Sequence, residues 1–193
     1  GLFRLKNTRI GADGDILTTD LDQFLSPYQP VSHDIARWGG GIELEIAGYL
    51  CTDAPSNDLV SSVRAIVFRG DHVLVMNNIG GAHILPGGRV EEGETHEETL
   101  RRELLEEAGT KIKIIAQIGF VHLRHTTPKP KDYAFPYPHF IWPIYNASFE
   151  RWKPDARAEG DYEISSQFLP IQEVRGLKLQ GYEMAFLEAA VSD

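Results

Sequence analysis

The alternation of apolar and polar residues predicts strands in two places in the first part of the chain. Ile42–Leu50 alternates apolar and acidic residues over its first half, which is the pattern of a half-buried strand. Farther on, Val63–Phe68 and His72–Met76 are rich in β-branched residues, and the dipeptide Gly70-Asp71 between them suits a tight turn. We therefore expect a β-hairpin over residues 63–76.

A helical pattern comes next, bounded by a capping signal and a glycine. Leucine and alanine residues recur four apart in the segment 100–108, so they would stack on one face of a helix. Thr95 with Glu98 three residues later is a capping-box pattern, in which each residue satisfies a backbone amide of the other. Gly109 suits the left-handed conformation that ends helices. The sequence predicts a helix over residues 95–108.

The residues after this helix predict three strands, a loop and a final helix. Pro143 lacks an amide hydrogen, so we expect its strand to be an edge strand or to contain a bulge. Strands surrounding two helices indicate an α/β fold. The elements are strands over Lys111–Leu123, His139–Phe149 and Ser165–Leu169, a proline-rich loop over Thr126–Pro138, and a helix over Tyr182–Ala190 with Tyr182, Ala185, Phe186 and Ala189 on one face.

Composition and charge narrow the class of protein. The chain has 193 residues, of which 42% are hydrophobic and 24% charged, as is typical of a globular domain. Its formal net charge of −9 makes nucleic-acid binding unfavourable, because phosphates attract clustered Lys and Arg. We see neither an apolar run near the roughly 18 residues of a membrane span nor a secretory signal, and Cys51 is alone. We expect a cytoplasmic protein.

The first 57 residues differ in character from the rest of the chain. The run Gly39-Gly40-Gly41 is conformationally free, and Pro27 and Pro30 interrupt any long element there. We treat residues 1–57 as an N-terminal extension, which either adds a strand to the sheet or contacts a second subunit, and residues 58–193 as the main domain.

One face of the predicted helix concentrates negative charge. Glu103, Glu106 and Glu107 fall within an arc of about 100°, and no Lys or Arg three or four residues away on that arc neutralises all three. A hard divalent cation with oxygen ligands would relieve the repulsion, although a glutamate-rich face is also common on plain solvated surface. The preceding segment 85–88, Leu-Pro-Gly-Gly, lets the backbone approach a ligand closely and favours the cation.

The spacing of these residues resembles the box of the Nudix hydrolase (MutT-like) family, G-x5-E-x7-R-E-U-x-E-E-x-G-U, where U is a bulky aliphatic residue. Thr110 is the one departure, at the final U position, where it affects packing after the helix and not the carboxylates. The resemblance covers residues 59–190 and leaves the subfamily open. The matching residues are Gly88, Glu94, Arg102, Glu103, Leu104, Glu106, Glu107 and Gly109.

The resemblance implies an α/β/α sandwich with a mixed β-sheet, in which the box forms a loop–helix–loop. It implies hydrolysis of a pyrophosphate bond with Mg²⁺ or Mn²⁺, in a nucleoside diphosphate linked to another moiety. Gly88, Glu94 and Gly109 would shape the motif. By position, the metal ligands would be Glu103, Glu106, Glu107 and the Gly87 carbonyl; the catalytic residues would be Arg102, which holds a box glutamate, and Glu106 or the outlying Glu163 as general base.

The sequence indicates the type of reaction more clearly than the substrate. We expect Gly88, Arg64 and Tyr133 to contact it, since Tyr133 could stack a base from the proline-rich loop. ADP-ribose, nucleotide sugars, dinucleotides and nucleoside triphosphates all remain candidates. An alternative is a catalytically silent Nudix-fold sensor of a nucleotide sugar, although such proteins usually lose box carboxylates. A decapping or sanitising enzyme stays open, and a homodimer is common in the family.

Overall fold

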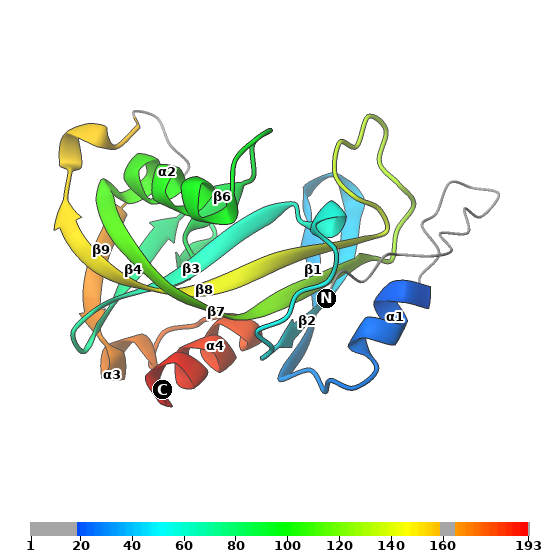
Figure 1. The fold of residues 1–193 in the computed structure, drawn as a ribbon, viewed down its shortest axis with the longest axis horizontal. Coiled ribbons are helices and arrows are strands. Elements are labelled where there is room, and N and C mark those ends of the chain that lie inside the picture. The colour runs from blue at the N-terminus through cyan, green and yellow to red at the C-terminus, as the bar shows by residue number, and fades with distance from the viewer. Residues whose placement is uncertain (1–18, 159–164, 193) are drawn as a thin grey trace.

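A computed structural model of the chain describes residues 19–158 and 165–192, in which a mixed β-sheet is flanked by helices (Figure 1). Its strand order is β1-β2-β7-β8-β3-β4-β5, while β6 pairs with β3 and β9 with β4. Strands β3 and β8 run parallel, and the other pairs are antiparallel. The strands are β1 Ser32–Trp38, β2 Ile42–Tyr49, β3 Ser62–Arg69, β4 His72–Asn78, β5 Gly81–His83, β6 Gly87–Arg89, β7 Thr110–His125, β8 His139–Trp152 and β9 Ser165–Pro170; the α-helices are α1 Thr19–Leu25, α2 His96–Ala108, α3 Ile171–Val174 and α4 Gly181–Ser192.

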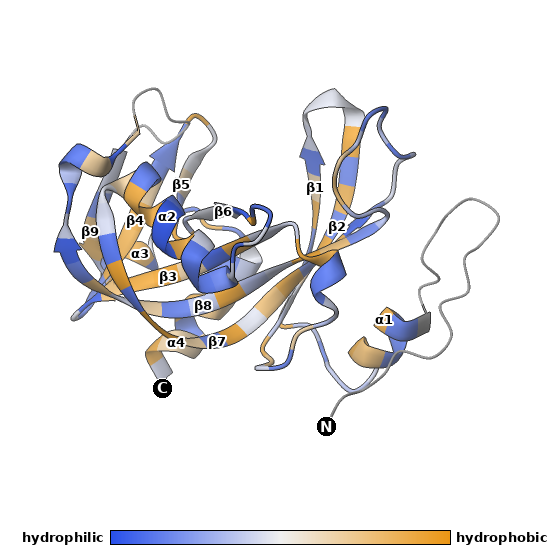
Figure 2. Cartoon of the chain, turned by 45° about the horizontal axis from the view of Figure 1, so that its top comes forward, coloured by the Kyte–Doolittle hydropathy of each residue, from blue (hydrophilic) through white to orange (hydrophobic). Residues whose placement is uncertain are grey.

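The two faces of the sheet carry different helices, as an α/β/α sandwich requires. In β3, Val63, Ala65 and Val67 pack in one apolar cluster with Leu100 of α2. Ile66, between them in sequence, packs in another cluster, together with Phe186 and Leu187 of α4. Because successive residues of a strand point to opposite faces of the sheet, α2 and α4 lie on opposite faces. Figure 2 shows hydrophobic residues along β3 and β4, whereas α2 is largely hydrophilic.

The predicted hairpin is present. Phe68 pairs with Val73 and Arg69 with His72, and Gly70 has a positive φ of 61° in the turn between them. The segment 126–138 is a loop, and β7 and β8 are each longer than the sequence pattern suggested. The predicted elements are therefore present in the predicted order and differ mainly at their ends, whereas α1, β1, β5, β6 and α3 were not predicted.

Pro143 does not lie in an edge strand, so that alternative is wrong. Strand β8 lies between β7 and β3, and Pro143 pairs with Phe120 of β7. The parallel ladder to β3 begins only at Ile144, opposite Arg64, so the missing amide hydrogen falls outside it. A register shift lies nearby in β7, between Gln117 and Gly119. The proline is tolerated at the start of one ladder and next to an irregularity in the other.

Helix α4 forms as predicted, but its buried face is rotated from the predicted one. The buried residues are Glu183, Phe186 and Leu187, whereas Ala185 and Ala189 are only partly buried. A count of apolar residues could not find this face, because one of its members is a carboxylate. Burial of Glu183 is stabilised by hydrogen bonds from two backbone amides, those of Ile84 and Gln180.

The segment before residue 58 contributes two strands to the sheet. Strand β2 pairs with β7 over six residue pairs, from Leu44–His125 to Tyr49–Phe120, and β1 pairs with the outer side of β2. Leu44 is fully buried in the same apolar cluster as Phe186. Among the described residues, no helix is long and apolar enough to cross a membrane.

Candidate active site

Helix α2 is fixed at both ends by the residues that predicted it. Thr95 accepts a hydrogen bond from the Glu98 amide, the Glu98 carboxylate accepts one from the Thr95 amide, and Gly109 adopts the left-handed conformation. Thr110, the departure from the family pattern, is buried, and its hydroxyl donates to the Ala108 carbonyl at 3.2 Å. The buried stripe of the helix consists of Thr99, Leu100, Leu104 and Ala108. The acidic residues are left on the side facing the preceding loop.

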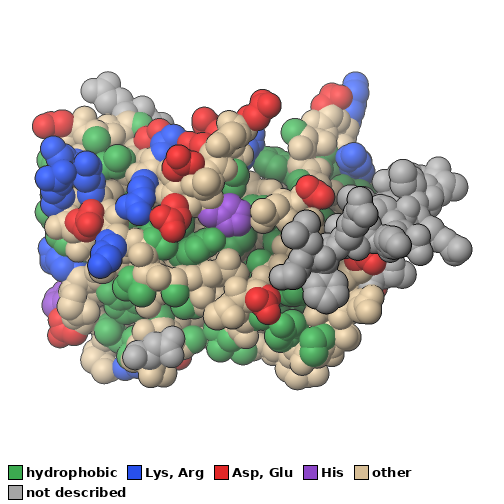
Figure 3. All heavy atoms as spheres, viewed as in Figure 1, with side chains coloured by type: hydrophobic (Ala, Val, Ile, Leu, Met, Phe, Trp, Pro, Cys, Tyr) green, Lys and Arg blue, Asp and Glu red, His purple; other side chains and the backbone are tan. Residues whose placement is uncertain are grey.

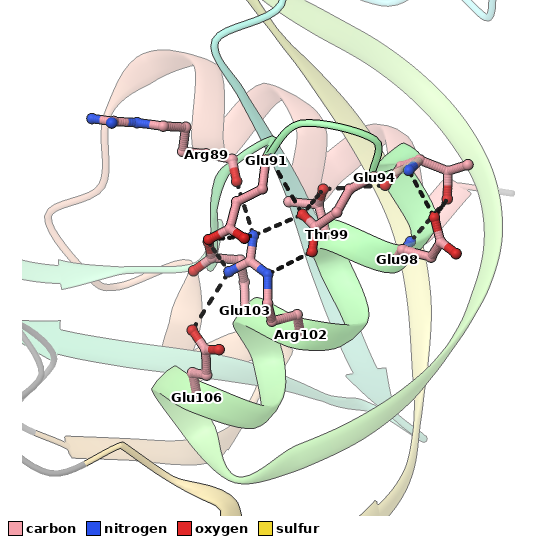
Figure 4. Close-up of polar contacts among 9 residues, drawn as sticks. Arg89, Glu91, Glu94, Glu98, Thr99, Arg102, Glu103 and Glu106 are labelled. Atoms are coloured by element: carbon pink, nitrogen blue, oxygen red, sulfur yellow. Dashed lines mark hydrogen bonds and ion pairs between the residues drawn. The ribbon is translucent and has the colours of Figure 1, made fainter.

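Arg102 organises this acidic side, as Figure 4 shows. Its Nε and Nη2 donate to the two carboxylate oxygens of Glu94 at 2.7 and 2.9 Å, which is a bidentate pair. Its Nη1 donates to Glu103 at 2.8 Å and reaches Glu106 at 3.5 Å. Nη2 also donates to the Arg89 carbonyl at 3.0 Å, which holds the loop before the helix. One guanidinium thus joins three box glutamates to the loop.

The environment of each carboxylate shifts its pKa in a different direction. Hydrogen bonds from Arg102 and Thr99 lower the pKa of Glu94 to about 2, so this residue stays ionised. Burial raises the pKa of Glu103, and the neighbouring charge of Glu106 raises it further, while Arg102 opposes both effects. The glutamates also raise the pKa of Arg102. Figure 3 shows acidic and basic side chains next to one another over this helix.

The β6 loop lies against both strand β3 and helix α2, and at Gly87 the β3 backbone leaves room for glycine alone. A Cβ atom on Gly88 would lie 2.3 Å from the Glu103 carboxylate, and one on Gly87 would lie 2.2 Å from the Val63 carbonyl oxygen. The Gly87 amide donates to Glu107 at 3.1 Å. The loop therefore presses on two of the three clustered glutamates and fixes their distance from the sheet.

A pocket of about 460 Å³ opens beside this loop. It brings Arg64 together with Gly87 and Glu107, which joins a predicted substrate contact to two predicted metal ligands. The Arg64 guanidinium donates to the Leu85 carbonyl at 3.0 Å, and its Nε is buried without a partner. The lining residues are Trp38, Arg64, Asn78, Gly80, Gly81, Ala82, His83, Leu85, Gly87, Glu107, Trp142, Gln180, Tyr182 and Glu183.

Of the predicted substrate contacts and metal ligands, only Arg64, Gly87 and Glu107 line this pocket among the described residues. Tyr133 does not line it; instead its hydroxyl lies 2.9 Å from Nε2 of His125, and its ring packs edge-on against Phe135. Glu163 lies outside the described residues. Trp38 and Trp142 also line the pocket, and the sequence pattern did not single them out.

The donor set matches a hard divalent cation in its chemistry. Carboxylate and carbonyl oxygens are the ligands that Mg²⁺ takes. Glu103, Glu106 and Glu107 supply carboxylates, of which Glu107 lies at the Gly87 amide and Glu103 beside Gly88. Within residues 19–158 and 165–192, however, no three His, Cys, Asp or Glu side chains converge as a ready cation site. Glu103 and Glu106 face Arg102, and Glu107 faces the Gly87 amide.

Comparison with known proteins finds curated relatives that match about half of the chain. NAD-capped RNA hydrolases NudC from Yersinia pestis (strain Pestoides F) and Yersinia pseudotuberculosis serotype O:1b (strain IP 31758) are each 29% identical over 103 residues. The match covers 52% of this chain and 35% of theirs, so the chain spans about a third of the length of these curated relatives.

A solved structure gives the same fold. The Bacillus subtilis pyrophosphohydrolase BsRppH aligns with a TM-score of 0.51 and 20% identity, covering 81% of this chain and 92% of that one. The family model of the NUDIX domain matches residues 58–186, which is well over half of the chain and includes the whole loop and helix described above. The chain belongs to the NUDIX family.

Proposed function

We propose that the chain is a pyrophosphohydrolase that uses Mg²⁺ or Mn²⁺ to cleave a nucleoside diphosphate linked to another moiety. The observation that carries the proposal is the complete acidic face of α2 at the edge of a pocket. Glu107 belongs both to that face and to the pocket lining, and Arg64 supplies a cationic group on the same lining. A diphosphate in the pocket would therefore meet the carboxylates that bind a cation and an arginine that binds phosphate.

Each residue of the cluster has a distinct part in this proposal. Glu103, Glu106, Glu107 and the Gly87 carbonyl would hold the cation, which supplies charge neutralisation and a more acidic water when bound. Arg102 holds Glu94 and Glu103 in place, which keeps the loop and the helix in register. Arg64 would bind a phosphate oxygen of the substrate.

We propose that a glutamate acts as the general base, with Glu106 as the first candidate. The Glu106 side chain is 47% exposed, compared with 15% for Glu103, so Glu106 is the more accessible to a water molecule. A base must lie within hydrogen-bond reach of the attacking water. Glu163, which comes after the cluster in sequence, is the second candidate.

The first experiment incubates the protein with Mg²⁺ or Mn²⁺ and each of ADP-ribose, dinucleoside polyphosphates, nucleotide sugars, NADH and nucleoside triphosphates, and measures the release of nucleotide products by chromatography. In Glu106→Gln, turnover should fall by about 10²-fold or more, because the carboxylate is lost while the shape is kept. The melting temperature should change little, since Glu106 is partly exposed.

Glu97→Gln is the matched control, because Glu97 lies on the same helix and its carboxylate pairs with Arg101 instead of with the cluster. The control should keep wild-type turnover. Full activity in Glu106→Gln would remove Glu106 from the mechanism. Release from none of the substrates by the wild-type protein would contradict the hydrolase proposal and favour the alternative, a nucleotide-sugar sensor.

The named activity of the Yersinia relatives suggests a second substrate class. NAD and NAD-capped RNA belong in the same screen, because both contain a pyrophosphate between two nucleosides. The charge of −9 weighs against a long nucleic-acid contact, which needs clustered Lys and Arg. A homodimer and a cytoplasmic location stay predictions; the first is tested by the mass of the protein in solution.

A further inference from the structure

Two stacked tryptophans form an aromatic wall on the pocket. Trp38 ends β1 and Trp142 lies in β8; their rings are nearly parallel, with an interplanar angle of 9° and a centroid separation of 6.1 Å. Both rings line the same pocket as Glu107 and Arg64. The wall therefore lies in the same pocket as the phosphate-binding residues of the proposed function.

Trp142 is the fixed member of this pair. Its side chain is buried, and its indole Nε1 donates to the Ser61 hydroxyl at 3.1 Å. The Arg64 guanidinium lies 4.6 Å from the ring centroid, a cation–π contact that further orients the ring. An indole held at its edge and on its face keeps one orientation.

Trp38 is the exposed member. It is 39% exposed, and it precedes a turn in which Gly40 and Gly41 have φ of 76° and 77°. A Cβ atom at any position of Gly39–Gly41 would meet nothing within 4 Å. The ring thus ends a strand beside an uncrowded turn, with much of its surface open to contact.

The geometry points to Trp38 as a specificity residue, whose exposed ring, supported from behind by Trp142, stacks the planar base of the nucleotide substrate. This inference rests on the proposed function. An aromatic ring can stack on any base, whereas a ligand without a base gains no stacking energy. The wall would therefore select diphosphates that carry a nucleoside. The pocket volume, about 460 Å³, lies in the range of small-molecule sites. Trp38 precedes the matched residues 58–186, so this selectivity would come from the added segment.

A purely structural role for Trp38 makes a different prediction. Its ring also lies 6.2 Å from Phe140, so it could serve only to hold β1 against β8. Loss of such a contact would lower stability and affect all ligands alike. Loss of a base platform would weaken only ligands that contain a base.

The test uses the full chain with Trp38→Leu, which keeps apolar packing without an aromatic face, and Trp38→Phe, which keeps a ring. Binding of AMP and of inorganic pyrophosphate is measured by calorimetry with Mg²⁺ present. In Trp38→Leu, AMP affinity should fall about tenfold or more, and pyrophosphate affinity should not change. Trp38→Phe should stay within about threefold of the wild type for both ligands, because it keeps an aromatic face.

Kinetics give a second readout. On the best base-containing substrate, Trp38→Leu should raise KM with kcat nearly unchanged, because stacking remote from the reacting phosphorus is equal in ground and transition states. Ile35→Ala is the control, since Ile35 is a 61% exposed apolar residue of the same strand and does not line the pocket. It should match the wild type in every measurement.

Three binding results would overturn the inference: unchanged AMP affinity in Trp38→Leu, equal losses for AMP and pyrophosphate, or no AMP binding by the wild type. Hydrolysis that persists with an unchanged KM in Trp38→Leu would overturn the aromatic wall but leave the proposed function standing. AMP binding that depends on Trp38, without hydrolysis of any diphosphate, would support the wall and contradict the hydrolase proposal.

Discussion

Arg102 illustrates how one residue changes the electrostatics of a whole face. The sequence places three glutamates close together on α2, and such like-charge pairs are destabilising by a few tenths of a kcal/mol each. Arg102 contacts Glu103 and Glu106 directly, while Glu107 instead accepts from the Gly87 amide. The repulsion is therefore relieved within the chain for part of the cluster, and the remaining repulsion favours a cation.

The bidentate pair of Glu94 with Arg102 predicts a pH-dependent contribution to stability. The pKa of Glu94 is about 2 in the folded protein against an ordinary 4.5, so its ionised form stabilises the fold above pH 4.5. That contribution is lost as pH falls from about 4.5 towards 2. Glu94→Gln should therefore melt below the wild type at pH 7, and the difference should shrink at pH 3.5.

Thermal unfolding at pH 7, 5, 4 and 3.5 measures this difference. Glu97→Gln serves as the control, because its carboxylate is 60% exposed and pairs with Arg101 away from the cluster. A gap between wild type and Glu94→Gln that stays constant down to pH 3.5 would show that the ionised pair does not stabilise the fold.

Helix α4 positions the loop of the candidate site from far along the chain. Glu183 accepts hydrogen bonds from the amide of Gln180, at the start of its own helix, and from the amide of Ile84, just before the box loop. Ile84 leads into Leu85, whose carbonyl accepts from Arg64. The helix, the loop and the arginine of the pocket are thus linked by consecutive hydrogen bonds.

Replacing Glu183 by alanine should destabilise the protein by about 2 kcal/mol, the cost of a buried polar group that loses its partner. The Ile84 residue is fully buried, so its amide would be left without access to water. Chemical denaturation measures the loss. Glu188→Ala, on the same helix but with a carboxylate 46% exposed, should have a smaller effect. Equal effects of the two substitutions would contradict a special role for Glu183.

At the scale of the whole molecule, the segment before residue 58 is part of the sheet and the core. Leu44 and Ile46 of β2 are 0% and 3% exposed and pack with Val121 and Leu123 of β7 in the main apolar cluster. Gly119 of β7 would place a Cβ atom 2.1 Å from the Tyr49 carbonyl oxygen, so the two strands meet closely. The segment also carries the exposed tryptophan of the pocket.

A chain that lacks residues 1–57 should therefore be less stable than the full chain. Its β7 would become an edge with unpaired backbone groups and uncovered apolar side chains, which promotes aggregation. Melting temperature and mass in solution measure both effects. A truncation that removes only residues 1–18 keeps α1, β1 and β2 and serves as the control. An unchanged melting temperature and mass after removal of residues 1–57 would contradict this expectation and the subunit-contact alternative.

The local sequence determined the features that depend on neighbours along the chain. The hairpin, the helix with its capping box and final glycine, and the grouping of Glu103, Glu106 and Glu107 on one side result from short spacings and backbone preferences. The box also identified the family, because all of its residues lie within one loop and one helix. Such features depend only on a few residues that are close together in the sequence.

Only the tertiary structure decided which distant residues line the pocket beside the acidic helix. Trp38 and Arg64 line one pocket although β2, β7 and β8 lie between β1 and β3 in the sheet, and no spacing in the sequence encodes that arrangement. The same holds for Glu183, which is buried because two backbone amides, one of them from the distant loop, donate hydrogen bonds to its carboxylate. Long-range pairing sets these contacts, and a carboxylate or an indole looks the same in sequence whether it faces water or a ligand.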